Sequence, residues 1–133
     1  MKLELKHLAP YLPYGLKNQR AFHKPKVIDG IVGNKVYFGD TVLFINQIEP
    51  ILRPLSDLTK EIEFDNEKFT PSKDKYWGMN SFQYHINKFE NWESPSAYLN
   101  SCAPYGLLLV LIKWHFDVFG LIDAGLAIDI NTI

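Results

Sequence analysis

Apolar side chains are most concentrated near the C-terminal end, in the run from Tyr105 to Ile112. Pro104 precedes this run, and proline fits the first turn of a helix because its missing N–H needs no partner there. The few positions that interrupt the apolar pattern, among them Lys113, recur at helical spacing. A helix with so narrow a polar stripe is typical of a protein core. We therefore predict a buried central helix over residues 105–116.

Two shorter patterns follow this helix. Residues 118–125 indicate a second helical piece that ends at Gly125, since glycine commonly stops a helix. From Leu126 to Ile130, apolar side chains alternate with polar or small ones. Alternation of this kind is the period of a strand with one buried face. The chain is thus expected to close with a terminal strand over residues 126–130.

The first half has short apolar runs, rich in β-branched and aromatic side chains, between turn-forming pairs. Gly33-Asn34 is a two-residue hairpin signal, and Gly39-Asp40 and Asp65-Asn66 are further turn signals. We therefore predict an antiparallel meander over residues 27–69. Its expected strands lie within residues 27–32, 35–38, 41–45, 61–64 and 67–69.

The chain before the meander contains two prolines, Pro10 and Pro13, and a polar, basic segment. Pro10 and Pro13 exclude a long helix in residues 3–16, so a short strand or a turn is expected there. The polar segment from residue 17 to residue 26 is expected to form a loop or the edge of a strand.

Two serines and one apolar face predict three further helical elements, one within residues 27–69 and two after them. Ser56 is a suitable N-cap for a single helical turn. Apolar side chains that recur at helical spacing predict a helix near residues 80–89. Ser94 followed by Pro95 is a helix start signal, and that helix is expected to run to about residue 102.

Strands that precede helices, with a strand at the end, indicate an α+β fold. The length of 133 residues suits one domain, and an apolar content of 47% is sufficient for a core. We predict a single domain over residues 1–133. In it, an N-terminal antiparallel β meander is packed by a C-terminal helical half with a buried central helix and a terminal strand.

Charge is distributed unevenly, although the formal net charge is only −1. Residues 1–26 hold six Lys or Arg against one acid. Basic side chains next to an aromatic ring, here Phe22, suit a phosphate backbone and stacked bases. Solvated loop charge explains the same pattern. The candidate residues for binding an anionic partner are Lys17, Arg20, His23, Lys24 and Lys26.

Aromatic side chains are unusually frequent between residues 76 and 98. They belong either to the core or to a protein interface, where Trp and Tyr are enriched. An open edge of the terminal strand is a second place where another chain could pair. From these two features we predict a homodimer. The candidate interface residues are Trp77, Tyr84, Trp92, Tyr98 and Ile128.

Three smaller features offer chemistry, and each has an ordinary structural explanation. On a helix, His115 and Asp117 point about 200° apart, so together they make a poor metal site. Cys102 has no positioned base in the sequence, and a single cysteine is usually a small buried residue. Arg53, four residues before Asp57, suits either an ion pair with a carboxylate that fixes a turn or the binding of an anionic ligand.

No motif of an enzyme, a phosphate-binding loop or a metal site is present in the sequence. We therefore expect no catalytic residues, no cofactor and no metal. The uninterrupted apolar run of the central helix is far shorter than the ~20 residues of a membrane span, so we expect no membrane insertion. A lone cysteine and the absence of an apolar leader favour a cytoplasmic protein.

Three segments, residues 7–17, 50–63 and 112–131, carry a resemblance to a known family. They read HLAPYLPYGLK, PILRPLSDLTKEIE and IKWHFDVFGLIDAGLAIDIN. These strings resemble a family of short uncharacterised proteins of Bacteroidetes phages and prophages. The resemblance implies a viral or mobile-element origin and an intracellular setting, and it implies no activity.

Together these observations favour a small non-enzymatic interaction or accessory protein of a phage or mobile element that binds a protein partner. The alternative is a nucleic-acid accessory protein that uses the basic segment 17–26.

Overall fold

The computed structural model describes residues 2–20, 22–71, 75–76, 80–81, 87–101 and 103–133. The chain forms two compact units. Unit 1 contains residues 1–53 and 120–133, and unit 2 contains residues 54–119. Whether the two units fold as the single domain that we predict stays a prediction, so each unit is described by itself.

Unit 1 begins with helical turns where the sequence predicted a short strand or a turn. Helix α1 (Leu5–Leu8) continues into the 3-10 helix η1 (Ala9–Tyr14). The expectation of a strand is wrong because the φ that proline imposes also suits a 3-10 helix, whose turns are tighter than those of an α-helix. Leu8 and Tyr11 are fully buried, and Gly15, at φ 75°, ends the helical segment.

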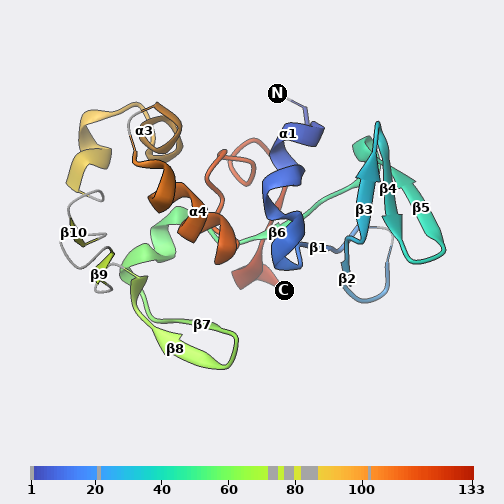
Figure 1. The fold of residues 1–133 in the computed structure, drawn as a ribbon, viewed down its shortest axis with the longest axis horizontal. Helices are drawn as coiled ribbons and strands as arrows, with labels where there is room; N and C mark the ends of the chain where they lie inside the picture. The colour runs from blue at the N-terminus through green and yellow to red at the C-terminus, as the bar shows by residue number, and fades with distance from the viewer. Residues whose placement is uncertain (1, 21, 72–74, 77–79, 82–86, 102) are drawn as a thin grey trace. The chain divides into compact units, whose positions relative to one another are not determined.

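A three-stranded antiparallel sheet is the main strand element of unit 1. Its strands β3 (Gly30–Val32), β4 (Lys35–Phe38) and β5 (Thr41–Phe44) lie side by side in chain order (Figure 1). Before it, β1 (Lys17–Asn18) pairs with β2 (Lys26–Val27). After it comes the 3-10 helix η2 (Ile45–Gln47). The predicted antiparallel meander is therefore confirmed in this part of the chain.

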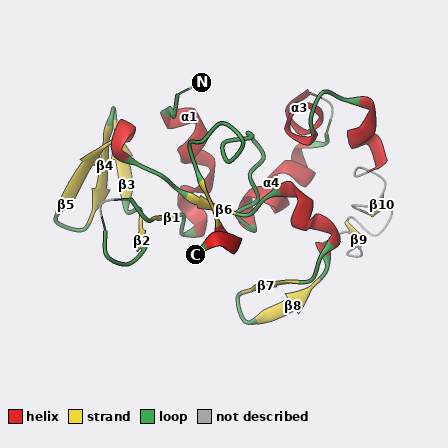
Figure 2. Cartoon of the chain, turned by 180° about the vertical axis from the view of Figure 1, so that it is seen from behind, coloured by secondary structure: helices red, strands yellow, loops and turns green. Residues whose placement is uncertain are grey.

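The terminal strand is present, but it is shorter than predicted. Strand β11 (Ile128–Asp129) pairs in parallel with β6 (Ile51–Leu52), and the N–H of Ile128 donates to the Pro50 carbonyl at 2.8 Å. In Figure 2 the C-terminal end of the chain lies close to β6. The 3-10 helix η6 (Ile130–Thr132) follows β11. The helix predicted over residues 118–125 is instead a series of turns.

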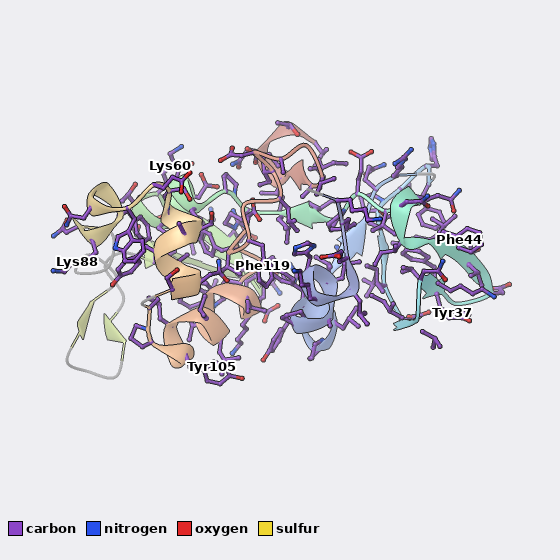
Figure 3. The ribbon with its side chains drawn as sticks, turned by 90° about the horizontal axis from the view of Figure 1, so that it is seen from above. Tyr37, Phe44, Lys60, Lys88, Tyr105 and Phe119 are labelled. Atoms are coloured by element: carbon purple, nitrogen blue, oxygen red, sulfur yellow. The ribbon has the colours of Figure 1, made fainter. Side chains whose placement is uncertain are left out.

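Unit 2 contains the two helices that the start signals predicted. In α3 (Pro95–Ser101), the N–H of Ala97 donates to the Ser94 hydroxyl at 3.1 Å, which confirms Ser94 as a capping residue. Helix α4 (Tyr105–Lys113) buries Leu107, Leu111 and Ile112. Tyr105, labelled in Figure 3, is 74% exposed, so the helix keeps one solvent-facing side.

Helix α4 ends three residues earlier than predicted. His115 takes a left-handed conformation with φ 63°, which no helix can continue. The N–H of His115 donates to the Ile112 carbonyl at 2.9 Å and closes the last turn. Phe116 and Val118 are fully buried beyond this bend.

The strands that the structure describes in unit 2 form two antiparallel pairs. The first joins β7 (Ile62–Phe64) to β8 (Glu67–Phe69), and Asp65 and Asn66 have φ of 51° and 65°, as a type I′ turn requires. This hairpin agrees with the prediction. The second joins β9 (Lys75–Tyr76) to β10 (Asn80–Ser81).

Two local predictions in unit 2 need correction. The 3-10 helix η3 (Leu55–Thr59) begins before Ser56, which therefore does not cap it. The helix predicted near residues 80–89 is a strand at its first two residues, because β10 pairs with β9, whereas residues 87 and 88 are helical as predicted. Residues 82–86 lie outside the described residues, and the 3-10 helix η5 (Phe89–Asn91) follows.

Strands in the N-terminal half, helices in the C-terminal half and a closing strand confirm the α+β class. Among the described residues, no helix is long and apolar enough to cross a membrane.

Asn18 provides a test of stability and of domain organisation. Its side chain is fully buried, accepts from the Glu49 N–H at 2.7 Å and donates to the Arg20 carbonyl at 2.8 Å. Asn18→Ala leaves both backbone groups without these partners and is expected to lower the free energy of unfolding by about 2 kcal/mol. Denaturant titration measures this loss, with the exposed Asn46→Ala as a control expected to change stability by less than about 0.5 kcal/mol.

The same variant tests whether the chain is one domain. All three tryptophans lie in unit 2, whereas Asn18 lies in unit 1. In a single cooperative domain, Asn18→Ala shifts the midpoint of tryptophan fluorescence together with that of circular dichroism. An unchanged fluorescence midpoint, with faster amide exchange in β1, would mean that the units unfold separately.

Candidate functional site

The strand register of unit 1 decides which side chains of the sheet share a face. Val32 is paired with Lys35, and Lys35 with Phe44, while Tyr37 lies between Gly30 and Val42. Paired residues of antiparallel strands point to the same side of a sheet, as do residues two apart on one strand. Six residues therefore form one face, which we call the outer sheet face: Gly30, Val32, Lys35, Tyr37, Val42 and Phe44.

This outer sheet face is apolar and open to solvent. Val32 is 70% exposed, Val42 is 46% exposed and Phe44 is 49% exposed. Tyr37, which Figure 3 labels together with Phe44, is half-buried. Val36 and Phe38 of the central strand point to the opposite face and are buried. The sheet is therefore apolar on both sides, whereas a sheet that faces water usually has polar side chains on the solvated side.

The β5 edge of this sheet is partly blocked by a side chain. The Ile45 N–H donates to the Asn34 carbonyl at 2.8 Å and continues the β4–β5 ladder. Because hydrogen-bonded and non-hydrogen-bonded pairs alternate, the N–H of Phe44 points away from β4. That N–H donates to the Gln47 side-chain oxygen at 2.9 Å. A capped edge is less suited to pairing with another strand.

A cavity of about 620 Å³ adjoins the outer sheet face at Phe44. Polar groups from Arg20, Asn34, Asn46 and Glu49 line it together with Phe44 and Ile45. Arg20 is engaged in this region, since its Nη1 donates to the Asn46 carbonyl at 3.3 Å and its Nε lies 3.8 Å from a Glu49 carboxylate oxygen. The cavity therefore contains a cation that is already paired.

The basic segment 17–26 spans β1, β2 and their connection. Its five candidate residues, Lys17, Arg20, His23, Lys24 and Lys26, are all exposed. The Phe22 ring, however, is half-buried against Phe38, with ring centroids 4.8 Å apart. The ammonium group of Lys26 lies 4.7 Å from the centre of the same ring. Phe22 is thus occupied on two sides, which reduces its value as a stacking platform for bases.

The predicted aromatic interface is only partly within the described residues. Trp92 is 37% exposed and lies over Tyr98, with ring centroids 5.8 Å apart. Tyr98 is buried and also contacts Phe89, so it has the surroundings of a core residue. Ile128 is half-buried in β11. Trp77 and Tyr84 lie outside the described residues.

The residues considered for catalysis or metal binding are not assembled into a site in the part that the structure describes. His115 follows the end of α4, so the helical angle between it and Asp117 does not apply, and its ring lies 5.7 Å from that of Phe64. Asp57 is buried with the Lys60 ammonium 3.6 Å away. Arg53 is half-buried, and its pairing with a carboxylate stays a prediction. Cys102 lies outside the described residues.

The described residues contain no group of three or more His, Cys, Asp or Glu side chains that could hold a metal ion. The outer sheet face is the feature that the sequence analysis missed. The two-residue loops at Gly33 and Gly39 fix its register, so its membership could have been read from the hairpin pattern.

Comparison of the chain with models of protein families, with curated proteins and with solved structures finds no match.

Gln47 provides a test of the blocked edge. Gln47→Ala removes the acceptor of the Phe44 N–H, so amide exchange at Phe44 is expected to accelerate by about tenfold. Hydrogen exchange followed by NMR measures this rate. Gln19→Ala, which alters a side-chain bond outside the sheet, is the matched control. An unchanged rate at Phe44 in Gln47→Ala would show that the side chain does not protect the edge.

Proposed function

We propose that the protein is a small non-enzymatic interaction protein of a phage or mobile element, and that it binds a partner protein through the outer sheet face. The observation that carries this proposal is the exposure of Val32, Val42 and Phe44 on the same face of an ordered sheet. Contiguous exposed apolar residues mark interaction sites more often than scattered ones do. The proposed origin rests on the resemblance of residues 7–17, 50–63 and 112–131 to phage and prophage proteins.

The position of Lys35 favours a different protein over a second copy of the chain. Lys35 is exposed at the middle of the outer sheet face, between Val32 and Phe44. In a symmetric dimer the same patch meets itself, so a two-fold axis near the centre of this face would bring two Lys35 ammonium groups together. Like charges in an apolar interface are unfavourable. The expected partner presents an apolar surface with a carboxylate opposite Lys35.

The mode of binding is face-on rather than by addition of a strand. The Phe44 N–H is already bonded to Gln47, which leaves few open groups along the short strand β5. Strand addition depends on a continuous row of such groups. Aromatic and aliphatic side chains on the face would instead supply the apolar anchors of the interface.

The homodimer is a separate proposal that concerns other residues. β11 has two residues, so its edge offers little length for pairing between copies. The exposed part of Trp92 gives the aromatic region the better support.

A nucleic-acid accessory role is the second candidate function. It is favoured by the exposed positions of Lys17, His23 and Lys24, which have no ion pair with the described residues. Counted over the sequence, unit 1 holds eight Lys or Arg against six Asp or Glu, whereas unit 2 holds six against nine. The positive side chains therefore belong mainly to unit 1, but the excess is small for a protein that binds a phosphate backbone.

A pair of valines tests the protein-binding proposal. A photo-crosslinking residue is placed at Val42 on the outer sheet face, or at Val27 on β2, whose exposure of 44% is close to the 46% of Val42. The experiment uses lysate of phage-infected Bacteroidetes cells. The proposal expects one dominant adduct with a different protein from position 42 and none from position 27. With that partner purified, Val42→Lys is expected to weaken binding by about tenfold or more, and Val27→Lys to leave it unchanged.

Two results would contradict this function. An adduct of twice 15.4 kDa would identify a second copy of the chain as the occupant. Equal crosslinking from positions 27 and 42, or equal affinity of the two lysine variants, would show that the outer sheet face is not the binding surface.

The nucleic-acid alternative is tested by charge reversal. Lys17→Glu with Lys24→Glu is expected to abolish any gel shift of single-stranded or duplex DNA at low salt, because each change replaces an attraction to phosphate by a repulsion. Lys68→Glu with Lys88→Glu, in unit 2, makes the same change in net charge elsewhere. If the unmodified protein gives no gel shift, the nucleic-acid alternative is ruled out. If the gel shift survives in Lys17→Glu with Lys24→Glu and is lost in Lys68→Glu with Lys88→Glu, the binding site lies outside the basic segment.

A further inference from the structure

A second cavity, of about 630 Å³, lies in unit 2 and is independent of the outer sheet face. It is formed where the β7–β8 hairpin meets the C-terminal end of α4. Figure 1 shows the hairpin extending beyond this helix. Its volume is within the range of small-molecule sites in proteins. The side chains that define its chemistry are Phe64, Asp65, Glu67, Phe69, Lys113 and Trp114.

The hairpin register brings aromatic and acidic side chains to one side. Ile62 pairs with Phe69, and Phe64 pairs with Glu67. Because the side chains of paired residues share a face, Phe64, Glu67 and Phe69 point in the same direction. The remaining pair, Glu63 with Lys68, points to the opposite face. This arrangement explains why the first three line the cavity and the last two do not.

Three aromatic rings form the walls of the cavity. The Phe69 and Trp114 rings lie 4.8 Å apart between centroids and are inclined by 57°, so they meet as two sides of a corner. The Phe64 ring is held nearly perpendicular to the ring of His115, at 5.7 Å. The face of an aromatic ring carries partial negative charge and attracts cations, most strongly for tryptophan.

Two carboxylates add negative charge at the cavity. Asp65 and Glu67 are exposed, and neither has a hydrogen bond or an ion pair with the described residues. The left-handed φ of 51° at Asp65 fixes its place in the turn. Lys113 also lines the cavity, so its ionisable side chains comprise two acids and one base.

The C-terminal end of α4 adds further partial negative charge at the cavity. The helix ends at Lys113, and Trp114 caps it, so both residues that α4 supplies to the cavity lie at its C-terminal end. The C-terminal end of a helix carries partial negative charge and favours cations. Aromatic faces, carboxylates and a helix terminus thus favour a cation, and among the lining side chains Lys113 opposes it.

We propose that this cavity binds an organic cation, an ammonium or guanidinium group, between Trp114, Phe69 and the carboxylates of Asp65 and Glu67. A metal ion fits this cavity less well. Hard cations such as Ca²⁺ and Mg²⁺ need several convergent oxygen ligands, whereas three walls of the cavity are aromatic rings. A methylated ammonium or a guanidinium group is only weakly hydrated, so it can exchange water for ring faces. The same chemistry is offered by a free methylated amine and by an arginine side chain of a peptide.

The test uses choline, its uncharged isostere 3,3-dimethylbutan-1-ol, and an arginine-containing peptide amide as probes. Each is titrated into the full chain, and NMR follows the Trp114 indole resonance and the probe's methyl or guanidinium signals. The proposal expects saturable shifts with choline, with the peptide, or with both, and at least tenfold weaker binding of the isostere. The cation that binds more tightly, choline or the arginine peptide, shows whether the natural ligand is a free methylated amine or a peptide arginine. Equal binding of choline and its isostere would show an apolar site without charge recognition and would overturn the proposal, as would the absence of any saturable shift.

Two variants locate the site. Asp65→Asn with Glu67→Gln keeps side-chain size and suits the left-handed turn, and it is expected to weaken cation binding by about tenfold. Glu61→Gln with Glu63→Gln makes the same change in net charge outside the cavity and is expected to leave binding unchanged. Trp114→Leu keeps an apolar side chain but removes the ring, so it is expected to weaken choline binding more than that of the isostere. If the two double variants bind the cation with equal affinity, the binding site lies elsewhere and the assignment is refuted.

Discussion

Two-residue loops control the surfaces of both units. Gly33 and Gly39, at φ 61° and 64°, each occupy the first position of such a loop, where a positive φ is required in type II′ turns. A loop of fixed length fixes the strand register, and a slip by one residue would turn the side chains of the slipped strand to the other face of the sheet. With β5 slipped by one residue, Val42 and Phe44 would point to the same, buried side as Val36 and Phe38. The outer sheet face is therefore a direct consequence of turn geometry.

The same constraint operates in unit 2, with different residues. Asp65 and Asn66 are among the few residue types that adopt a left-handed φ at modest cost, and together they set the register of β7 and β8. The hairpin then presents Phe64 and Phe69 on the side where α4 ends. His115 supplies the third left-handed residue, and by stopping α4 it leaves Trp114 at the cavity rather than inside a longer helix. In both units, therefore, the backbone conformation of a few turn residues determines which side chains share the surface.

The two units differ in what they offer to a partner. Unit 1 combines an apolar sheet face with exposed lysines, and one of its cations, Arg20, is held by Asn46 and Glu49. Unit 2 holds the excess of acidic residues and an aromatic cavity. The two proposals therefore rest on different surfaces, an apolar sheet face in unit 1 for a protein partner and an aromatic cavity in unit 2 for an organic cation.

The sequence by itself determined the elements whose signals are local. Gly33-Asn34, Gly39-Asp40 and Asp65-Asn66 specified hairpins because turn chemistry involves only neighbouring residues. Ser94 with Pro95 specified the start of α3 for the same reason. The α+β class followed from the order of these elements.

Tertiary structure decided the features that depend on residues far apart in the chain. The pairing of β11 with β6 joins Ile128 to Ile51, and two residues of alternating pattern give no indication of a partner so distant. The early end of α4 at His115 and the convergence of Trp114 with the β7–β8 hairpin were likewise set by packing within unit 2. Helical spacing continues through residue 116 in the sequence, but burial of Phe116 beyond the bend takes precedence over that local preference. Periodicity describes which side of an element is apolar, whereas the surface that this side meets, and hence the site, is defined only when the elements are packed.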